Sequence, residues 1–170
     1  LNKDRVDIDI MVGNNVFEFS KILSKRLGIN TTVNFEKFQT SRIPHHECDI
    51  EIANARSEFY EPNSRKPSKI ITASIEDDLI RRDFTINTIC MSLNEHNYGD
   101  LIDPYHGLKD IDKGIIKTPA EPNKTFIDDP LRMLRAIRFA AQLNFEIPDE
   151  IKKSIIENRA RIKIVSFERI

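Results

Sequence analysis

Glycine, cysteine and long apolar runs are scarce in this 170-residue sequence. Five glycines exclude a collagen-like chain, and two cysteines exclude a disulfide scaffold. No apolar run approaches the roughly 18 residues of a membrane-spanning helix, so we expect no membrane partner. A Gly-rich phosphate loop is also missing, so a triphosphate would have to be held by side chains and metal. The 39% of apolar residues is lean, yet it suits about one folded domain.

The two cysteines, Cys48 and Cys90, match none of the paired spacings of a zinc site. Each falls in an apolar stretch, which predicts small buried side chains and a reducing, cytoplasmic compartment. Residues 1–12 carry several charges, unlike a secretory signal peptide.

Charge is nearly balanced, with 26 basic and 27 acidic residues and a formal net charge of −1. A dedicated nucleic-acid-binding domain usually carries a basic surplus, so the total alone argues against one. The two signs are unevenly distributed, because residues 1–118 hold an acidic surplus and residues 119–170 a basic one. The near-neutral sum therefore does not exclude an enzyme that acts on nucleic acid.

Residues 1–118 are predicted to mix strands and helices. Residues 6–12 (VDIDIMV) alternate acidic and apolar side chains, as a strand does. A helix follows, with apolar positions Val16, Phe19, Leu23 and Leu27; Asn14 or Asn15 caps it and Gly28 closes it. Strands are predicted at 31–38 and 48–55, divided by a polar segment with Pro44, and a loop is predicted at 59–68. The last elements are a helix at 75–93 that opens with a Ser74–Asp77 capping box, a turn at Asp103-Pro104 and Gly107, and a strand at 115–118.

Residues 119–170 are predicted to be helical, with helices at about 129–143 and 149–159 and a third that begins near Ser166. We therefore expect an α+β fold for residues 1–118, followed by the start of an all-α unit.

Asp7 and Asp9 are two residues apart on a predicted strand, so both carboxylates project from the same face. Two such groups repel each other unless a cation lies between them, and Mg²⁺ accepts one or two carboxylates together with substrate phosphates. A third carboxylate, Glu51 or Asp49, lies in another predicted strand, and spacing alone does not choose between them. The alternative is a solvated strand face without a metal.

Arginines recur at Arg132, Arg135 and Arg138 on one face of the predicted helix that follows Pro130. The apolar residues Met133, Leu134, Ala136, Ile137 and Ala141 occupy the opposite side. Three guanidinium groups on one face can bind a polyanion such as a nucleoside triphosphate or an RNA backbone. The alternatives are an exposed basic face for the arginines and an N-cap role for Asp129.

Three motifs in this order resemble class II tRNA nucleotidyltransferases, the CCA-adding enzymes, and the related bacterial poly(A) polymerases. The resemblance covers essentially the whole chain. The motifs are Arg81-Arg82-Asp83-Phe84-Thr85-Ile86-Asn87, the turn with Asp103-Pro104, Gly107 and Asp110, and Asp128-Asp129-Pro130-Leu131-Arg132, which is similar to the family's E-D-x-x-R nucleotide template.

This resemblance implies a nucleotidyltransferase (polymerase beta-like) head at 1–118, with a mixed β-sheet and flanking helices, and the start of a helical neck at 119–170. It implies nucleotidyl transfer from CTP or ATP to the 3′ end of tRNA, with Mg²⁺ and release of pyrophosphate. By the same resemblance, Asp7 and Asp9 are the metal ligands and Glu51 is the third catalytic carboxylate. The implied nucleotide-binding residues are Arg82, Asp129, Arg132, Arg135 and Arg138.

Two departures from the family pattern are visible. Asp128 stands where the family usually has Glu, and the family's Gly-Gly loop is expected before Leu1. The RNA-binding body and tail are expected after Ile170.

Several alternatives to CCA addition stay open. They are a poly(A) polymerase, a CC-adding or A-adding enzyme, and a non-catalytic nucleotide- or RNA-binding module. A metal site at His45 and His46 is disfavoured, because no other Cys or His lies at ligand spacing. Arg81 is expected to be solvated or salt-bridged, and Phe84 and Ile86 to pack in the core.

Overall fold

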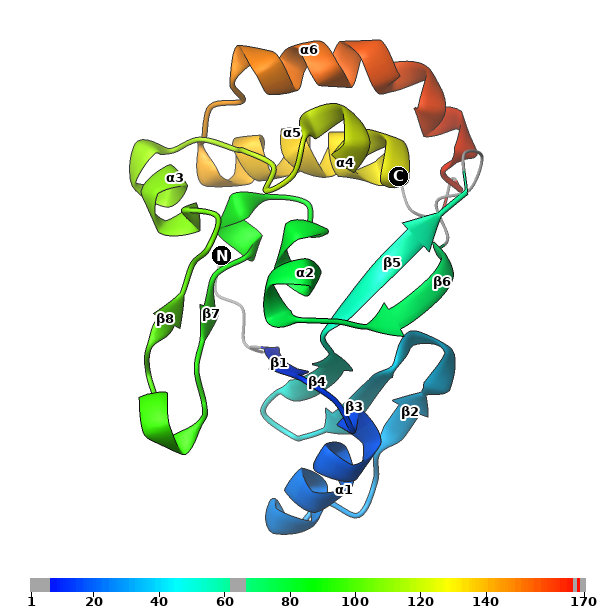
Figure 1. Cartoon of the computed structure of the whole chain (residues 1–170), viewed down its shortest axis with the longest axis vertical. Helices are drawn as coiled ribbons and strands as arrows, with labels where there is room; N and C mark the ends of the chain where they lie inside the picture. The colour runs from blue at the N-terminus through cyan, green and yellow to red at the C-terminus, as the bar shows by residue number, and fades with distance from the viewer. Residues whose placement is uncertain (1–6, 62–66, 167, 169–170) are drawn as a thin grey trace. The chain divides into compact units, whose positions relative to one another are not determined.

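The computed structural model describes residues 7–61, 67–166 and 168 (Figure 1). The chain packs as two compact units, each described by itself. The sheet unit comprises Leu1–Ser57 and Ile70–Asp77, and the helical unit comprises Glu58–Lys69 and Asp78–Ile170. The fold is α+β with a mixed sheet and flanking helices, as predicted. The division at residue 118 stays a prediction.

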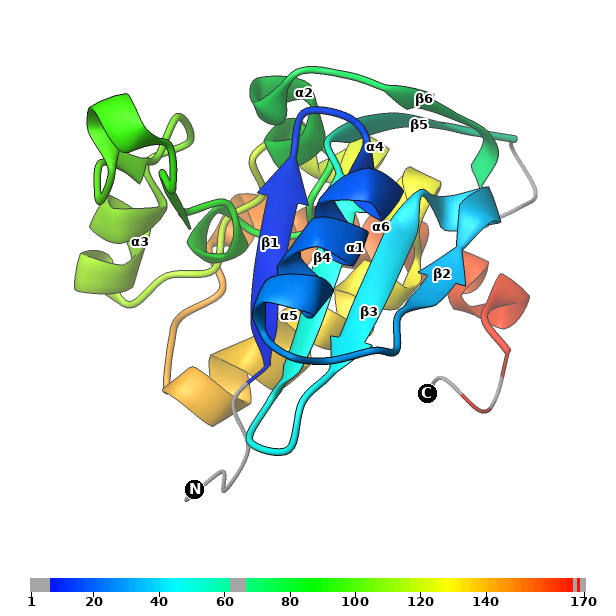
Figure 2. The same ribbon diagram turned by 90° about the horizontal axis from the view of Figure 1, so that it is seen from below.

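A four-stranded sheet forms the centre of the sheet unit, in the order β1-β4-β3-β2. The strands are β1 (Ile8–Val12), β2 (Val33–Phe35), β3 (Thr40–Pro44) and β4 (Asp49–Asn54), with a short 3-10 helix η1 (Glu36–Phe38) between β2 and β3. β1 and β4 run parallel, whereas the β4–β3 and β3–β2 pairs are antiparallel. Helix α1 (Val16–Arg26) lies across one face of this sheet (Figure 2).

The alternation along the strands builds the core beneath α1. The buried residues of this core are Val16, Ile43, Ile50 and Ile52. Burial of each such side chain contributes about 1.5–3 kcal/mol. Residues of the opposite parity, Asp9 and Glu51, are exposed, because successive side chains of a strand point to opposite faces.

Helix α1 is capped from a distant strand. Asn15 takes the N-cap position with a left-handed φ of 55° and makes no side-chain cap hydrogen bond. The backbone N–H of Val16 instead donates to Oδ1 of Asn54 at 3.1 Å. Gly28 has a φ of 71° and follows the end of the helix, as predicted. Asn15 therefore holds the N-cap position, one of the two that were predicted, but the side chain that binds the helix start belongs to Asn54.

The buried face of α1 matches the prediction only in part: Val16 is buried and Leu23 packs against the core. Phe19 is 38% and Leu27 is 43% exposed, whereas Ser20 and Ser24 are buried. The hydroxyl of Ser20 lies 2.7 Å from that of Ser41 on β3, so the buried face of α1 includes a polar pair that was not predicted.

Two predicted segments between residues 31 and 72 differ in the structure. The polar segment with Pro44 is strand β3, because Ser41 and Ile43 alternate inward and are both buried. The ends of the predicted loop at 59–68 belong to a two-stranded sheet of β5 (Arg56–Tyr60) and β6 (Pro67–Thr72), and residues 62–66 lie outside the described residues.

The predicted helix at 75–93 ends early. The Ser74–Asp77 capping box is confirmed, since the Asp77 N–H donates to Ser74 Oγ at 3.1 Å. Helix α2 covers only Ile75–Ile80. Phe84 is extended and fully buried, and the chain leaves the helix to place it in the core, as predicted for that side chain.

Short elements and four α-helices make up the rest of the described helical unit. They are η2 (Thr85–Asn87), β7 (Cys90–Met91), η3 (Glu95–Asn97), β8 (Leu101–Ile102), α3 (Gly107–Lys113), α4 (Pro122–Asp128), α5 (Leu131–Leu143), α6 (Asp149–Asn158) and η4 (Arg159–Ile164). The core includes Phe84, Ile116 and Ala136. The helices predicted at 129–143 and 149–159 are confirmed as α5 and α6, apart from a few terminal residues.

The strand predicted at 115–118 and the helix predicted near Ser166 are not found as such among the described residues. The expected strand at 115–118 is only an isolated bridge between Ile115 and Glu146, although Ile116 is fully buried. The helix expected near Ser166 falls largely on residues 167 and 169–170, which lie outside the described residues. Within the described ranges, no helix is both long and apolar enough to cross a membrane.

Candidate functional site

Two exposed carboxylates lie side by side on the sheet face opposite the α1 core. Asp9 of β1 and Glu51 of β4 are directly paired in the parallel register. Adjacent strands are about 4.8 Å apart, so the two side chains share one small area. Neither forms an ion pair with another described residue. Asp7 is also exposed and comes just before β1, which begins at Ile8.

The structure distinguishes the two possible third carboxylates. Asp49 is only 8% exposed, and its Oδ2 forms an ion pair with Nη2 of Arg42 on β3. Glu51 is exposed, and it stands directly beside Asp9 in the register. Glu51 is therefore the accessible carboxylate next to Asp9, and Asp49 is held by the neighbouring strand.

The acidic residues provide oxygen donors of the kind that Mg²⁺ prefers. The three carboxylates together do not form a triplet whose oxygens all lie within 4.8 Å of one another. Among the described residues, the one triplet that meets this distance is His45, His46 and Glu47, between β3 and β4. His45 Nδ1 accepts a hydrogen bond from the Glu47 N–H at 3.2 Å, so this ring nitrogen already has a partner.

A buried carboxylate, Asp78, holds two consecutive arginines after α2. Asp78 is 2% exposed. Its Oδ1 accepts from Arg81 Nη2 at 2.5 Å, and its Oδ2 accepts from Arg82 Nε at 3.2 Å. Arg81 also pairs with Glu58 at 3.3 Å, which confirms the expected salt-bridged role of Arg81. The guanidinium of Arg82 is thus fixed on one edge, while 38% of its side chain stays exposed.

A second carboxylate, that of Asp83, binds Arg135 of helix α5. Arg135 Nε on α5 donates to Asp83 Oδ2 at 2.6 Å. Asp83 Oδ1 accepts from the N–H of Phe84 at 2.9 Å and from Asn87 Nδ2 at 3.0 Å. Because both oxygens have partners, Asp83 sets the orientation of Arg135.

The start of α5 holds the predicted template pair. Asp129 Oδ1 accepts from the Leu131 N–H at 3.1 Å, although the N-cap residue of α5 is Pro130 and not Asp129. Arg132 Nη2 donates to the carbonyl oxygen of Arg81 at 2.6 Å. Burial raises the pKa of Asp128, although Arg132 and other cations nearby lower it.

Tyr60 joins the same group of charges. Its hydroxyl donates to Glu58 at 2.5 Å. Burial, together with the Glu58 carboxylate, raises the pKa of the Tyr60 phenol well above its usual range, so the group stays neutral at physiological pH. Tyr60 and Arg81 thus use the two oxygens of Glu58.

The faces of α5 are rotated relative to the prediction. Met133 and Ala136 are buried as expected, but Ile137 is 52% exposed. Phe139, which broke the predicted separation of faces, packs against the core instead, with its ring edge-on to Phe84. The guanidinium of Arg138 lies 5.1 Å from the Phe139 ring centre, a cation–π contact.

The structure thus brings together part of the predicted site in each unit. The carboxylates Asp7, Asp9 and Glu51 belong to the sheet unit. The predicted nucleotide-binding residues belong to the helical unit: Arg82, Asp129, Arg132, Arg135 and Arg138.

Sequence reasoning missed the carboxylates that orient the arginines. Asp78 could have been found, because it precedes Arg81 and Arg82 by three and four residues on a predicted helix. Glu58 gave no such local signal, because it lies on β5, far from Arg81 in the chain.

The family described as the Poly A polymerase head domain matches residues 1–117. The chain belongs to this family. It is 40% identical over 153 residues to an A-adding tRNA nucleotidyltransferase of Aquifex aeolicus, covering 90% of this chain and 18% of the relative. It is 36% identical over 171 residues to a CCA-adding enzyme of Geobacillus sp., covering 100% of this chain and 40% of the relative.

Solved structures agree with these relatives. A tRNA nucleotidyltransferase complexed with a primer tRNA and an incoming ATP analog has a TM-score of 0.81 and 36% identity, over 96% of this chain and 44% of that one. The Bacillus stearothermophilus CCA-adding enzyme in complex with CTP has a TM-score of 0.78 and 30% identity, over 96% and 37%. The chain spans about two fifths of the length of the CCA-adding enzymes that it matches.

Proposed function

We propose that the complete protein transfers nucleotidyl groups from CTP and ATP to the 3′ end of tRNA, adding or repairing the CCA sequence and releasing pyrophosphate. The observation that carries this proposal is the in-register pair of exposed carboxylates, Asp9 and Glu51, in a chain of the Poly A polymerase head family. The two free cysteines suit the reducing cytoplasm, which we propose as its compartment.

Asp7 and Asp9 would hold Mg²⁺, with Glu51 as the third carboxylate. Three exposed carboxylates that lack basic partners among the described residues form a donor set suited to this hard cation. When bound, Mg²⁺ supplies positive charge at the attacking oxygen and at the phosphates. The carboxylates themselves keep this face of the sheet anionic. Arg42 on the neighbouring strand is paired with Asp49.

The nucleotide would be held by the arginines of the helical unit. Asp129 and Arg132 present an acceptor and a donor fork that suit the Watson–Crick edges of cytosine and adenine. One of the five N–H donors of Arg132 binds the Arg81 carbonyl, and this bond fixes the plane of the guanidinium. Arg82, Arg135 and Arg138 supply positive charge for the triphosphate and ribose.

The reaction balances without a further reactant. The 3′-hydroxyl oxygen of the RNA forms a bond to the α-phosphorus, the bond between the α-phosphorus and the bridging oxygen breaks, and pyrophosphate leaves. The hydroxyl proton is released to a neighbouring base or to water.

The test uses the complete protein, a tRNA transcript that ends before CCA, and CTP and ATP separately and together. We expect addition of CCA with Mg²⁺-dependent release of pyrophosphate. Asp9→Asn should lower the rate at least about 100-fold, because one of the two carboxylates that we propose as metal ligands loses its negative charge. Glu18→Gln, on the exposed side of α1, is the matched control and should leave the rate unchanged. Full activity of Asp9→Asn would overturn the metal assignment.

One relative favours a narrower alternative. The A-adding enzyme of Aquifex aeolicus is 40% identical to this chain. Addition of a single A to a tRNA that ends in CC, without use of CTP, would show an A-adding enzyme, and addition of CC alone would show a CC-adding one. Long tails from ATP on any RNA would show a poly(A) polymerase. Binding without pyrophosphate release would show a non-catalytic module.

A further inference from the structure

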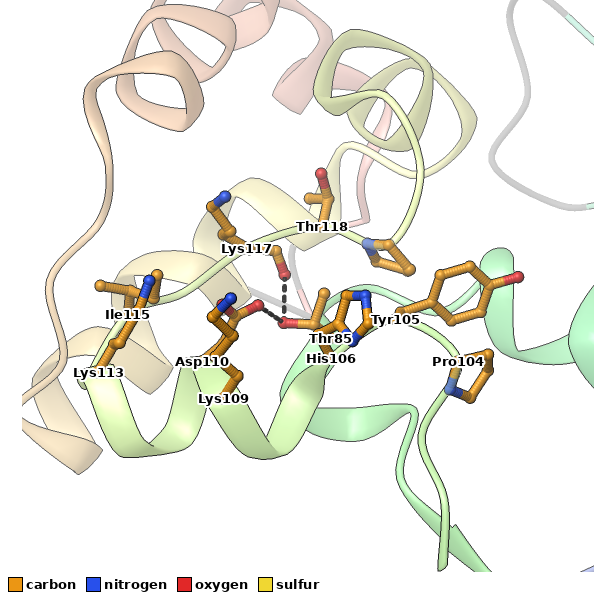
Figure 3. A pocket seen from close by; sticks show the side chains of 11 residues that line it. Thr85, Pro104, Tyr105, His106, Lys109, Asp110, Lys113, Ile115, Lys117 and Thr118 are labelled. Atoms are coloured by element: carbon orange, nitrogen blue, oxygen red, sulfur yellow. Dashed lines mark hydrogen bonds between the residues drawn. The ribbon is translucent and has the colours of Figure 1, made fainter.

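A pocket of about 370 Å³ lies in the helical unit. Its walls come from helix α3, from Thr85 and from the segment 115–119 (Figure 3). None of the five predicted nucleotide-binding residues lines it. The pocket is therefore a second feature of this unit that the proposed chemistry does not use.

Three lysines are among the residues that line this pocket. Lys109 and Lys113 are one helical turn apart on α3, about 6 Å along the axis, and both are exposed. Lys117 approaches from the segment across the pocket (Figure 3). His106 lies at the start of α3. Three ammonium groups around one opening repel one another unless an anion neutralises them.

Few carboxylates compensate this charge. Asp110 is 6% exposed, and it accepts from Thr85 Oγ1 at 2.7 Å, so its charge is directed into the protein. Lys117 and Glu150 are 3.8 Å apart with both side chains well exposed, a pair that contributes little. Lys109 and Lys113 form no ion pair with any residue that the structure describes.

The walls of the pocket are held in place by backbone contacts. The Thr85 N–H donates to the Lys117 carbonyl at 2.9 Å, and the Glu146 N–H donates to the Gly114 carbonyl at 2.7 Å. Gly107 packs so closely on Thr85 that an added Cβ would lie 2.2 Å from the Thr85 carbonyl oxygen. The lysines are thus mounted on a preformed frame, which lowers the ordering cost of binding.

The start of α3 is not itself the anion site. Asp103 accepts from the N–H groups of Gly107 and Leu108, at 2.7 and 3.0 Å, so a carboxylate already occupies these donors. The positive charge available to a ligand is therefore that of the lysine side chains. Ammonium groups on flexible side chains can reach the scattered phosphate oxygens of a polyanion, and they are less suited to binding a planar carboxylate.

We propose that Lys109, Lys113 and Lys117 bind backbone phosphates of the RNA substrate. This rests on the proposed function, which supplies an RNA that must be held while its 3′ end is extended. RNA is favoured over a free nucleotide because the charges are spread around an open pocket, whereas the arginines of α5 already form a separate cationic group on this unit. Lysines position a phosphate backbone without reading its sequence.

The test measures binding of a fluorescently labelled tRNA transcript to the complete protein at salt concentrations from about 50 to about 300 mM, which is wide enough to give the slope of log affinity against log salt. The variants are Lys109→Gln, Lys113→Gln, Lys117→Gln and their combination. Lys25→Gln on α1 removes the same charge elsewhere. Each pocket variant should weaken binding about fivefold at 0.1 M salt and lower the slope of log affinity against log salt by roughly 0.7. Lys113→Arg should retain most of the affinity.

Separate titrations with ATP and with pyrophosphate distinguish the source of the phosphate. Their affinities should be unchanged in the pocket variants, and a fall in either would overturn the RNA assignment in favour of a free-phosphate site. RNA affinity and slope equal to those of the parent, or no RNA binding by the parent, would also overturn it. A parent that binds RNA through these lysines but adds no nucleotide would refute the proposed function while supporting the pocket.

Discussion

Arg135 on α5 donates from Nε to Oδ2 of Asp83 at 2.6 Å, across 52 positions of the chain. Asp83 also accepts from the Phe84 N–H and from the Asn87 side chain, so three donors converge on one nearly buried carboxylate. The arginine that we place beside the nucleotide is therefore oriented before any nucleotide binds. Preorganised donors of this kind strengthen binding because no ordering is left to do.

Asp83→Asn should weaken nucleotide binding as well as the fold. The charge that orients Arg135 is lost, and we expect about a tenfold rise in KM for CTP and ATP and a loss of about 1–2 kcal/mol of unfolding free energy. Steady-state kinetics and urea unfolding check the two effects. Asp100→Asn, exposed in the same unit, is the control. In a double-mutant cycle with Arg135→Gln, additive KM effects would contradict a positioning role.

Glu51→Gln and Asp49→Asn should separate catalysis from stability. Glu51 is exposed beside Asp9, so its variant should lose activity at least about 100-fold with an unfolding free energy within about 0.5 kcal/mol of the parent. Asp49 is nearly buried against Arg42, so its variant should be destabilised by about 1–2 kcal/mol. Its remaining folded fraction should stay active. The reverse pattern would make Asp49 the third carboxylate.

Gly107→Ala should destabilise the protein by about 1–3 kcal/mol or more, because the new Cβ would collide with the Thr85 carbonyl. Gly13→Ala is the matched control, since nothing lies within 4 Å of its Cβ position. Thermal unfolding of the two variants gives the comparison. Equal melting temperatures would show that α3 can shift away from Thr85, contrary to the rigid frame described for the lysine pocket.

Asp128→Asn should change how stability depends on pH. Burial raises the pKa of Asp128 in the folded protein, so the folded state holds this proton more tightly than the unfolded state does. Its contribution is fully present below the ordinary carboxyl pKa and is lost as pH rises through the folded value. The stability of Asp128→Asn relative to the parent should therefore increase over that window and then level off. Urea midpoints at a series of pH values measure this.

The exposed Asp112→Asn variant controls for the general effect of removing an acid. A difference between Asp128→Asn and the parent that stays constant with pH, or falls as pH rises, would contradict the buried environment of the Asp128 carboxyl.

Local patterns predicted the features that depend on neighbouring residues. The alternation at residues 6–12 predicted β1, and the helical spacing around Arg132 predicted α5. The Ser74–Asp77 capping box formed because its two partners are three residues apart. The family motifs likewise lie in short continuous strings, so the chain alone identified the candidate carboxylates and arginines.

Only the tertiary structure decided which side chains those residues meet. The N–H at the start of α1 binds the side chain of Asn54. Asp49 pairs with Arg42, whereas Glu51 lies exposed beside Asp9. Helix α2 ends at Ile80, and Phe84 is buried. Each of these outcomes depends on strands or helices distant in the sequence, whose burial and hydrogen bonds outweigh local propensity. The sequence by itself therefore determined which charged groups the protein carries, and the packing of remote segments determined which of them are held and which remain accessible.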